Sequence, residues 1–134
     1  MSGVQPDDAR LVQLAREAAK NSMCPFSGFS VGAALLTKEG QVFLGCNIEN
    51  WSLSMSSCAE QVVMLKALSE GAREFSRIAV WADTENHVTP CGKCRQLLIE
   101  FAPDIEVIMA NGRGEFIKRP ISELLPMAFR HKIG

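Results

Sequence analysis

The sequence lacks an excess of charge of either sign. Its 14 Lys and Arg residues nearly balance its 15 Asp and Glu residues, which gives a formal net charge of −1, and the basic residues are dispersed along the chain. Proteins that hold a phosphate backbone gather their positive charge along one surface. The dispersed charge therefore argues against a nucleic acid polymer as the partner of this protein.

Long apolar runs, repeats and low-complexity tracts are also missing from the sequence. No apolar stretch approaches the roughly 20 residues of a membrane-spanning helix, and the polar N-terminus does not have the shape of a signal peptide. Five cysteines, three of them assigned below to a metal, indicate a reducing cytoplasm and not a disulfide scaffold. With 47% hydrophobic residues, the chain is expected to form a single domain over residues 1–134, without a membrane partner.

Three of the cysteines stand in a pattern that can bind zinc. Cys58 opens the motif Cys-Ala-Glu, and 30 residues after Glu60 the chain reaches the motif Pro-Cys-Gly-Lys-Cys, which contains Cys91 and Cys94. Three thiolates can hold a zinc ion and leave its fourth tetrahedral position for water. Glu60 is well placed to move protons on that water. The pattern predicts a catalytic zinc site and hydrolytic chemistry.

Each cysteine motif begins an apolar run that predicts a helix. Apolar residues follow Cys58 as far as Leu68, and after Cys91 and Cys94 they recur at three- and four-residue steps. Pro90 is typical of a helix start. Helix N-termini favour thiolate over thiol, because their free N–H groups and the helix dipole stabilise negative charge. The predicted inward face of the second helix consists of Cys91, Cys94, Leu97 or Leu98, and Phe101.

A closed structural zinc site and a redox pair are the alternatives to a catalytic zinc. Cys24, Cys46 or His87 could each supply a fourth ligand. Structural sites, however, usually offer their ligands as two close pairs, and no ligand stands close to Cys58 in the sequence. A redox Cys-x-x-Cys pair would leave Cys58 and Glu60 without a role.

The order of expected elements predicts an α/β domain with a mixed sheet. Asp7 or Asp8 can cap a first helix, and a turn around residues 38–40 joins the first two strands. The expected strands are Val31–Leu36, Val42–Cys46, Ile78–Ala82, Ile105–Met109 and Phe116–Lys118. The expected later helices run from Cys58 to about Ser69, from Cys91 to about Phe101, and briefly near Leu124.

Five ordered motifs resemble the cytidine deaminase superfamily, in its small three-cysteine branch. The zinc motifs Cys-Ala-Glu and Pro-Cys-x-x-Cys are two of them. The segment from Cys24 to Leu35 resembles the first segment of that family, and Gly45–Asn50 resembles its ribose-binding loop. Residues 123–126, Glu-Leu-Leu-Pro, followed by Phe129, resemble its C-terminal signature. The resemblance therefore extends over most of the chain.

This resemblance implies a three-layer α/β/α fold with a mixed five-stranded sheet. It implies one zinc ion per subunit, held by Cys58, Cys91 and Cys94. It also implies that Glu60 is the catalytic residue, which carries protons from water to N3 of a pyrimidine and then to the departing amine.

The same resemblance implies roles for five further residues. Asn47 and Glu49 would hydrogen-bond the ribose hydroxyls, Phe29 would contact the base, and the Ala59 backbone would hold the pyrimidine edge. Phe129 would reach the active site of a neighbouring subunit in a homotetramer. Without the resemblance, Asn47 and Glu49 would be interpreted as turn residues after a strand. The alternative for Phe29 is a core residue, and the alternative for Phe129 is a residue that holds the C-terminus.

Two features depart from the pattern of that family. Gln61 follows Cys-Ala-Glu where arginine is usual in this branch, so it brings no positive charge to offset three thiolates. The loop Trp51–Ser57 has the usual length but different residues. Both departures bear on the substrate.

The leading hypothesis is zinc-dependent hydrolysis of cytidine and 2′-deoxycytidine to uridine and 2′-deoxyuridine, with release of ammonia, in cytoplasmic pyrimidine salvage. The expected partner is a free nucleoside. One alternative is deamination of a modified cytosine nucleoside such as blasticidin S, because blasticidin S deaminases also lack the arginine. An alternative of another class is a non-catalytic binding module stabilised by zinc, which predicts four protein ligands.

Overall fold

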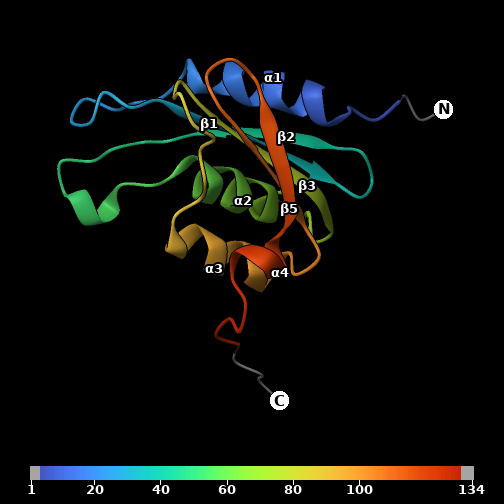
Figure 1. The fold of residues 1–134 in the computed structure, drawn as a ribbon. Helices are drawn as coiled ribbons and strands as arrows, with labels where there is room; N and C mark the ends of the chain where they lie inside the picture. The colour runs from blue at the N-terminus through green and yellow to red at the C-terminus, as the bar shows by residue number, and fades with distance from the viewer. Residues whose placement is uncertain (1–3, 131–134) are drawn as a thin grey trace.

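In a computed structural model that describes residues 4–130, the chain forms a five-stranded sheet with the order β2-β1-β3-β4-β5 (Figure 1). The apolar runs form β1, β3 and β4 at its centre, whereas β5 is largely exposed. β3 and β4 pair in parallel, and the other three pairs are antiparallel, so the sheet is mixed as predicted. The strands are β1 (Val31–Thr37), β2 (Val42–Cys46), β3 (Phe75–Ala82), β4 (Glu106–Ala110) and β5 (Phe116–Pro120).

Helices cover both faces of this sheet, which confirms the three-layer α/β/α fold (Figure 1). α1 (Asp8–Ala19) packs on one face, with Asp7 as its N-cap. The other face is covered by α2 (Ala59–Ser69), α3 (Gly92–Phe101) and the short α4 (Ile121–Leu124). The central strands are buried on both faces, because successive side chains point to opposite sides of a strand.

Two glycines let the helices approach the sheet closely. A Cβ atom on Gly32 of β1 would lie 1.8 Å from the Ala15 backbone oxygen of α1. A Cβ atom on Gly45 of β2 would lie 2.9 Å from the Val63 backbone nitrogen of α2. Contacts under 3.0 Å leave no room for any side chain. Gly45 therefore fixes how closely α2 approaches the sheet, and with it the place of the N-terminus of α2.

Several predicted details were wrong. Cys58 and Cys91 are N-cap residues, so each helix begins one residue later than expected. β3 begins at Phe75 and not at Ile78, because Phe75 is buried and pairs with Thr37. A short 3-10 helix, η1 (Leu53–Met55), lies in a segment that had been expected to be loop only.

The inward face of α3 also differs from the prediction. Phe101 is 40% exposed and Cys91 is exposed, whereas the buried residues of the helix are Cys94, Leu98 and Ile99. The helix ends at Phe101, and the chain after it fills that end of the core with Ala102 and Ile105. The periodicity therefore predicts burial wrongly at the first and last residues of the run, which lie at the two ends of the helix.

None of the helices within residues 4–130 is both long enough and apolar enough to cross a membrane.

Candidate active site

The three cysteines of the two motifs converge at the N-terminal ends of α2 and α3. Cys58 caps α2, Cys91 caps α3, and Cys94 lies in the first turn of α3. Their sulfur atoms all lie within 4.8 Å of one another. Tetrahedral zinc with Zn–S bonds of about 2.3 Å requires sulfur atoms roughly 3.8 Å apart. The donor set and its spacing therefore fit a zinc ion.

The electrostatics of the three sulfurs also fit a cation. A hydrogen bond from Cys94 is the main cause that lowers the pKa of Cys58 to about 6. A hydrogen bond from Cys91 and the charge of Lys93 also lower this pKa, whereas burial raises it. The same bond to Cys58, together with burial and the charge of Glu60, raises the pKa of Cys94. Hydrogen bonds from the Cys94 and Cys91 thiols thus stabilise the Cys58 thiolate. A divalent cation stabilises all three sulfurs as thiolates by displacing their protons.

Within residues 4–130, the group of close metal-ligating side chains contains these three cysteines alone. Cys24, Cys46 and His87, each considered as a fourth ligand, lie outside the group. Three ligands leave one tetrahedral position for a water or a substrate, as in catalytic zinc sites.

Glu60 lies in the first turn of α2 and is almost completely buried. Its exposed fraction is 5%, and burial raises the pKa of its carboxyl group to about 7, with a further contribution from the charge on Cys58. It lines the same cavity as Cys58 and Cys91. A carboxyl group in such a place can both accept and donate a proton near neutral pH.

The cavity beside Glu60 has a volume of about 290 Å³. It brings together most of the residues singled out in the sequence, from the segments that precede β1 and follow β2 and from the two helix ends. In Figure 1 the loop before β1, the loop with η1 and the starts of α2 and α3 lie toward the same side of the molecule. The lining residues are Ser27, Phe29, Val31, Asn47, Glu49, Cys58, Ala59, Glu60, Val88, Thr89 and Cys91.

Asn47 and Glu49 both line the cavity and fasten the loop that precedes β1. The Asn47 side chain accepts a hydrogen bond from Val31 N at 2.9 Å and donates one to Phe29 O at 2.7 Å. The Glu49 carboxylate accepts hydrogen bonds from the backbone N–H groups of Phe26 and Ser27, at 3.0 and 3.1 Å. A carboxylate has about four acceptor positions, so Glu49 retains capacity for a ligand.

Phe129 does not line this cavity within a single chain. Its side chain is 71% exposed, and its backbone oxygen accepts a hydrogen bond from Gln96 Nε2 at 2.9 Å. Gln61, next to Glu60, has a buried side-chain oxygen for which the described part of the chain supplies no hydrogen-bond partner.

Ser27, Val31, Val88 and Thr89 line the cavity but were not singled out as site residues from the sequence. Ser27 and Val31 lie beside Phe29, and Val88 and Thr89 come just before Pro90. Their nearness to recognised motifs was the available signal. Nothing in their own residue types marks them as functional.

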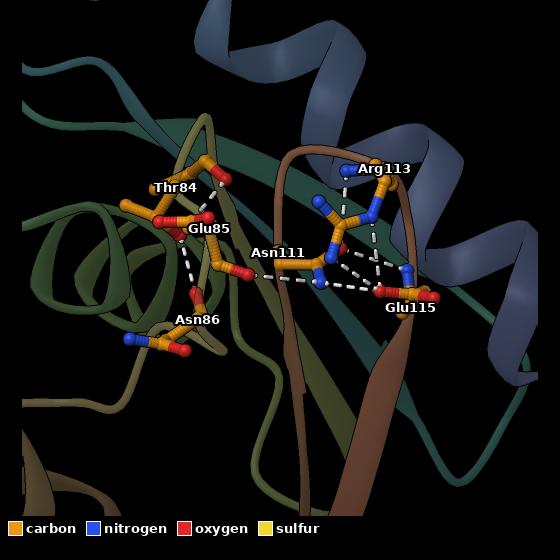
Figure 2. A network of polar contacts seen from close by, with 7 residues as sticks. Thr84, Glu85, Asn86, Asn111, Arg113 and Glu115 are labelled. Carbon is orange, nitrogen blue, oxygen red and sulfur yellow. Dashed lines mark hydrogen bonds and ion pairs between the residues drawn. The ribbon is translucent and has the colours of Figure 1, made fainter.

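The loop of residues 83–91, which ends in Cys91, is fastened to the turn between β4 and β5. Asn111, only 2% exposed, donates a side-chain hydrogen bond to Glu85 O at 3.3 Å (Figure 2). Val88 N donates to Ala110 O at 3.1 Å. The buried amide of Asn111 thus ties the wall of the cavity to the central sheet.

Known proteins resemble this chain in both sequence and fold. Residues 5–110 match the model of the cytidine and deoxycytidylate deaminase zinc-binding region. Over 124 residues, the chain is 43% identical to a cytidine deaminase from Sporosarcina psychrophila (92% of this chain, 91% of the relative) and 46% identical to one from Halalkalibacterium halodurans (92% and 94%). The solved cytidine deaminase from Burkholderia pseudomallei matches with a TM-score of 0.87 at 43% identity, covering 89% of this chain and 96% of the other.

A blasticidin-S deaminase from Bacillus cereus is also a relative, at 30% identity over 134 residues and 94% of each chain. The region that matches the family model includes both cysteine motifs and Glu60. Since that region covers most of the chain and the fold agrees as well, this chain belongs to the cytidine and deoxycytidylate deaminase family.

Proposed function

We propose that this protein is a zinc-dependent hydrolase that converts cytidine and 2′-deoxycytidine to uridine and 2′-deoxyuridine and releases ammonia. The observation that carries the proposal is the single cavity in which Cys58, Cys91 and the buried Glu60 face Asn47 and Glu49. When bound by Cys58, Cys91 and Cys94, zinc supplies Lewis-acid activation of a water molecule.

Glu60 is the proton carrier of the proposed reaction. It takes one proton from the attacking water and delivers it to N3 of the pyrimidine as the water oxygen bonds to C4. It then passes the second proton to the amino group, whose bond to C4 breaks as ammonia leaves. The burial of Glu60 next to Cys58 supports this role, because a carboxyl group shielded from bulk water has a pKa near neutral pH and can both accept and donate the proton.

Asn47 and Glu49 bind the ribose hydroxyls in this proposal, and Phe29 contacts the base. All three line the cavity on the side formed by the loops, which supports their assignment. Ala59 is the first residue of α2, so its backbone N–H has no partner within the helix and is available to the pyrimidine edge. A cavity that carries several hydrogen-bonding groups for hydroxyls discriminates against ligands that lack them.

We further propose a homotetramer in which Phe129 contacts the active site of a neighbouring subunit. Large apolar side chains are exposed on the segments around the cavity and at the C-terminal end, with exposed fractions of 94% for Trp51, 70% for Leu53 and 71% for Phe129. Exposed large apolar side chains on these two segments support an interface between subunits. Sedimentation of the wild-type protein tests this assembly, and a fully active monomer would contradict it.

The proposed setting is a single domain of residues 1–134 that acts in cytoplasmic pyrimidine salvage on free nucleosides and not on polymers. The five cysteines and the absence of a basic stripe support this setting.

Deamination of a modified cytosine nucleoside such as blasticidin S is the second candidate function. The specific observation in its favour is Gln61, the residue after Glu60. Gln61 has no positive charge to offset the three thiolates, a feature that this chain shares with the blasticidin S deaminases. The Asn47 and Glu49 pair, placed at the cavity, favours cytidine over this alternative. A non-catalytic zinc module is disfavoured by a ligand group of three cysteines in the described chain.

The experiment that tests the proposal is a deamination assay on purified, zinc-loaded protein, with ammonia release as the measurement. The panel contains cytidine, 2′-deoxycytidine, cytosine, adenosine and blasticidin S, and the Glu60→Gln variant is the control. Turnover of cytidine that depends on Glu60 is the expected result. Turnover of blasticidin S alone would favour the second candidate, and no turnover of any member would contradict both.

A further inference from the structure

The hydroxyl group of Ser27 links two residues of the cavity wall that are far apart in the sequence. It donates a short hydrogen bond to Glu49 Oε2, and it accepts one from the backbone N–H of Phe29 at 3.0 Å. The Ser27 backbone N–H donates to the other oxygen of the same carboxylate, Glu49 Oε1, at 3.1 Å. Ser27 itself lines the cavity.

These contacts hold the backbone of Phe29 from both sides. Its N–H donates to Ser27 Oγ, which in turn donates to Glu49, and its carbonyl oxygen accepts from Asn47 Nδ2 at 2.7 Å. Both Asn47 and Glu49 thus hold the backbone of Phe29. Asn47 does so directly, and Glu49 does so through Ser27. The loop is otherwise open, since Phe29 is 41% exposed and Ser27 is exposed.

We propose that Ser27 is a positioning residue that couples Glu49 to Phe29, so that the sugar-binding and base-binding sides of the cavity are held as one unit. The inference rests on the proposed nucleoside chemistry for its consequence in catalysis. A hydrogen bond to a charged group is about twice as strong as a neutral one, so the bond from Ser27 to Glu49 is the stronger of the two bonds that make this link. The hydrogen bond from Ser27 is also the main cause that lowers the pKa of Glu49, which agrees with a carboxylate held ionised in this place.

Removal of the hydroxyl should weaken binding without disturbing the chemistry. In Ser27→Ala, Glu49 loses a charge-assisted bond and the Phe29 N–H loses its acceptor, while Glu60 and the cysteines keep their own surroundings. We expect the KM for cytidine to rise about tenfold or more, with kcat changed by less than about twofold. Ser27→Thr keeps the hydroxyl and should restore a KM within about threefold of wild type.

Two controls separate this coupling from a general loss of structure. Ser30→Ala removes a hydroxyl from the same loop at a residue that does not line the cavity, and its KM should stay at the wild-type value. In a double-mutant cycle, Ser27→Ala should have a smaller effect when Glu49 is already Ala, because the hydroxyl then has no carboxylate to hold. Equal effects of Ser27→Ala in both backgrounds would overturn the coupling, and so would an unchanged KM in the single variant.

A measurement without substrate keeps the inference separate from the proposed function. Amide hydrogen exchange at Phe29, followed by NMR, should be faster in both Ser27→Ala and Glu49→Gln than in wild type and Ser30→Ala. Unchanged exchange in the two variants would overturn the inference even if cytidine is the substrate. Faster exchange in a protein that does not turn over cytidine would leave the coupling intact and overturn the proposed function.

Discussion

The two ends of the cavity are built from different kinds of structure. At one end, Ala59 and Glu60 lie in the first turn of α2, which packs into the core, and Glu60 is 5% exposed. At the other end, Phe29 and Glu49 lie outside the helices and strands, and Phe29 is 41% exposed. The first end is fixed by the packing of helices against the sheet. The second is fixed by hydrogen bonds between side chains and backbone.

In the proposed function, this difference separates the end that performs the chemistry from the end that binds the nucleoside. Groups that must keep their geometry to a fraction of an ångström are best placed on rigid elements, whereas loops can vary the ligand that is bound. Changes at the helix end should therefore abolish the reaction. Changes at the loop end should mainly alter affinity, and changes farther away should alter stability alone.

Loss of a zinc ligand should have the largest effect. Cys94→Ala removes the buried sulfur of the three, so we expect loss of stoichiometric zinc, loss of activity and a lower midpoint of thermal unfolding, because bound metal stabilises the folded state. Metal analysis and thermal unfolding measure this. Cys46→Ala is the matched control, since Cys46 lies outside the group and its variant should keep its zinc. Stoichiometric zinc in Cys94→Ala would contradict the site.

Loss of the Glu49 carboxylate should have an intermediate effect that is confined to binding. Glu49→Gln removes the negative charge of the side chain, which weakens the hydrogen bonds that it accepts from the backbone N–H groups of Phe26 and Ser27. We therefore expect the KM for cytidine to rise by about tenfold to a hundredfold, with a smaller change in kcat. Steady-state kinetics on zinc-loaded protein measure both parameters. A fall in kcat with an unchanged KM would remove the distinction between the two ends.

Loss of the buried Asn111 amide should affect stability more than chemistry. Asn111→Ala leaves Glu85 O without its side-chain donor and removes a buried amide, so the free energy of unfolding should fall by about 1–3 kcal/mol. Denaturant titration of the zinc-loaded protein measures the loss. Arg113→Ala, at an exposed residue of the same turn whose side chain bonds Glu115, is the control and should cost less. Equal losses in the two variants would argue against the tie to the loop of residues 83–91.

The smallest expected effect concerns Asp8, far from the cavity. Partial burial raises the pKa of Asp8, but hydrogen bonds from Lys118 and Arg77 lower it more, so the net pKa lies below 3.8. A carboxyl group with a lowered pKa stabilises the folded state at pH values above its ordinary pKa, and this contribution disappears as the pH falls through the folded-state pKa.

Asp8→Asn should therefore be less stable than wild type near neutral pH, and the difference should shrink as the pH falls below about 3.8. Denaturant titrations of both proteins across this pH range measure the difference in the free energy of unfolding. Both proteins lose zinc at low pH, so that effect cancels in the difference. A difference that does not depend on pH would contradict the ion pairs as its source.

The helix end of the cavity could be predicted from the sequence, whereas the loop end could be predicted only in part. The sequence predicted the helix starts at Cys58 and Cys91 to within one residue, because motif spacing and apolar periodicity are local signals. Periodicity failed at Phe101, where the chain leaves the helix. The link from Ser27 to Glu49 joins residues 22 apart through a hydrogen bond, and no local pattern of residues encodes such an approach.

The same limit applies to Asn111. The sequence shows an Asn-Gly pair, which predicts a turn, and the turn is present between β4 and β5. The bond from its side chain to Glu85 depends on how two loops meet above the sheet. That meeting is set by the pairing of β3 with β4, which is known only once the strand order is known.

Glu60 is the central residue of the proposed mechanism, and its role is tested most directly by the kcat of Glu60→Gln together with the zinc content of that variant. The variant keeps all three sulfurs, so we expect one zinc ion per chain and a fold like that of wild type. We expect kcat for cytidine to fall by about a hundredfold to ten-thousandfold, which is the usual contribution of a general acid and base. Turnover near the wild-type rate with zinc in place would contradict the account.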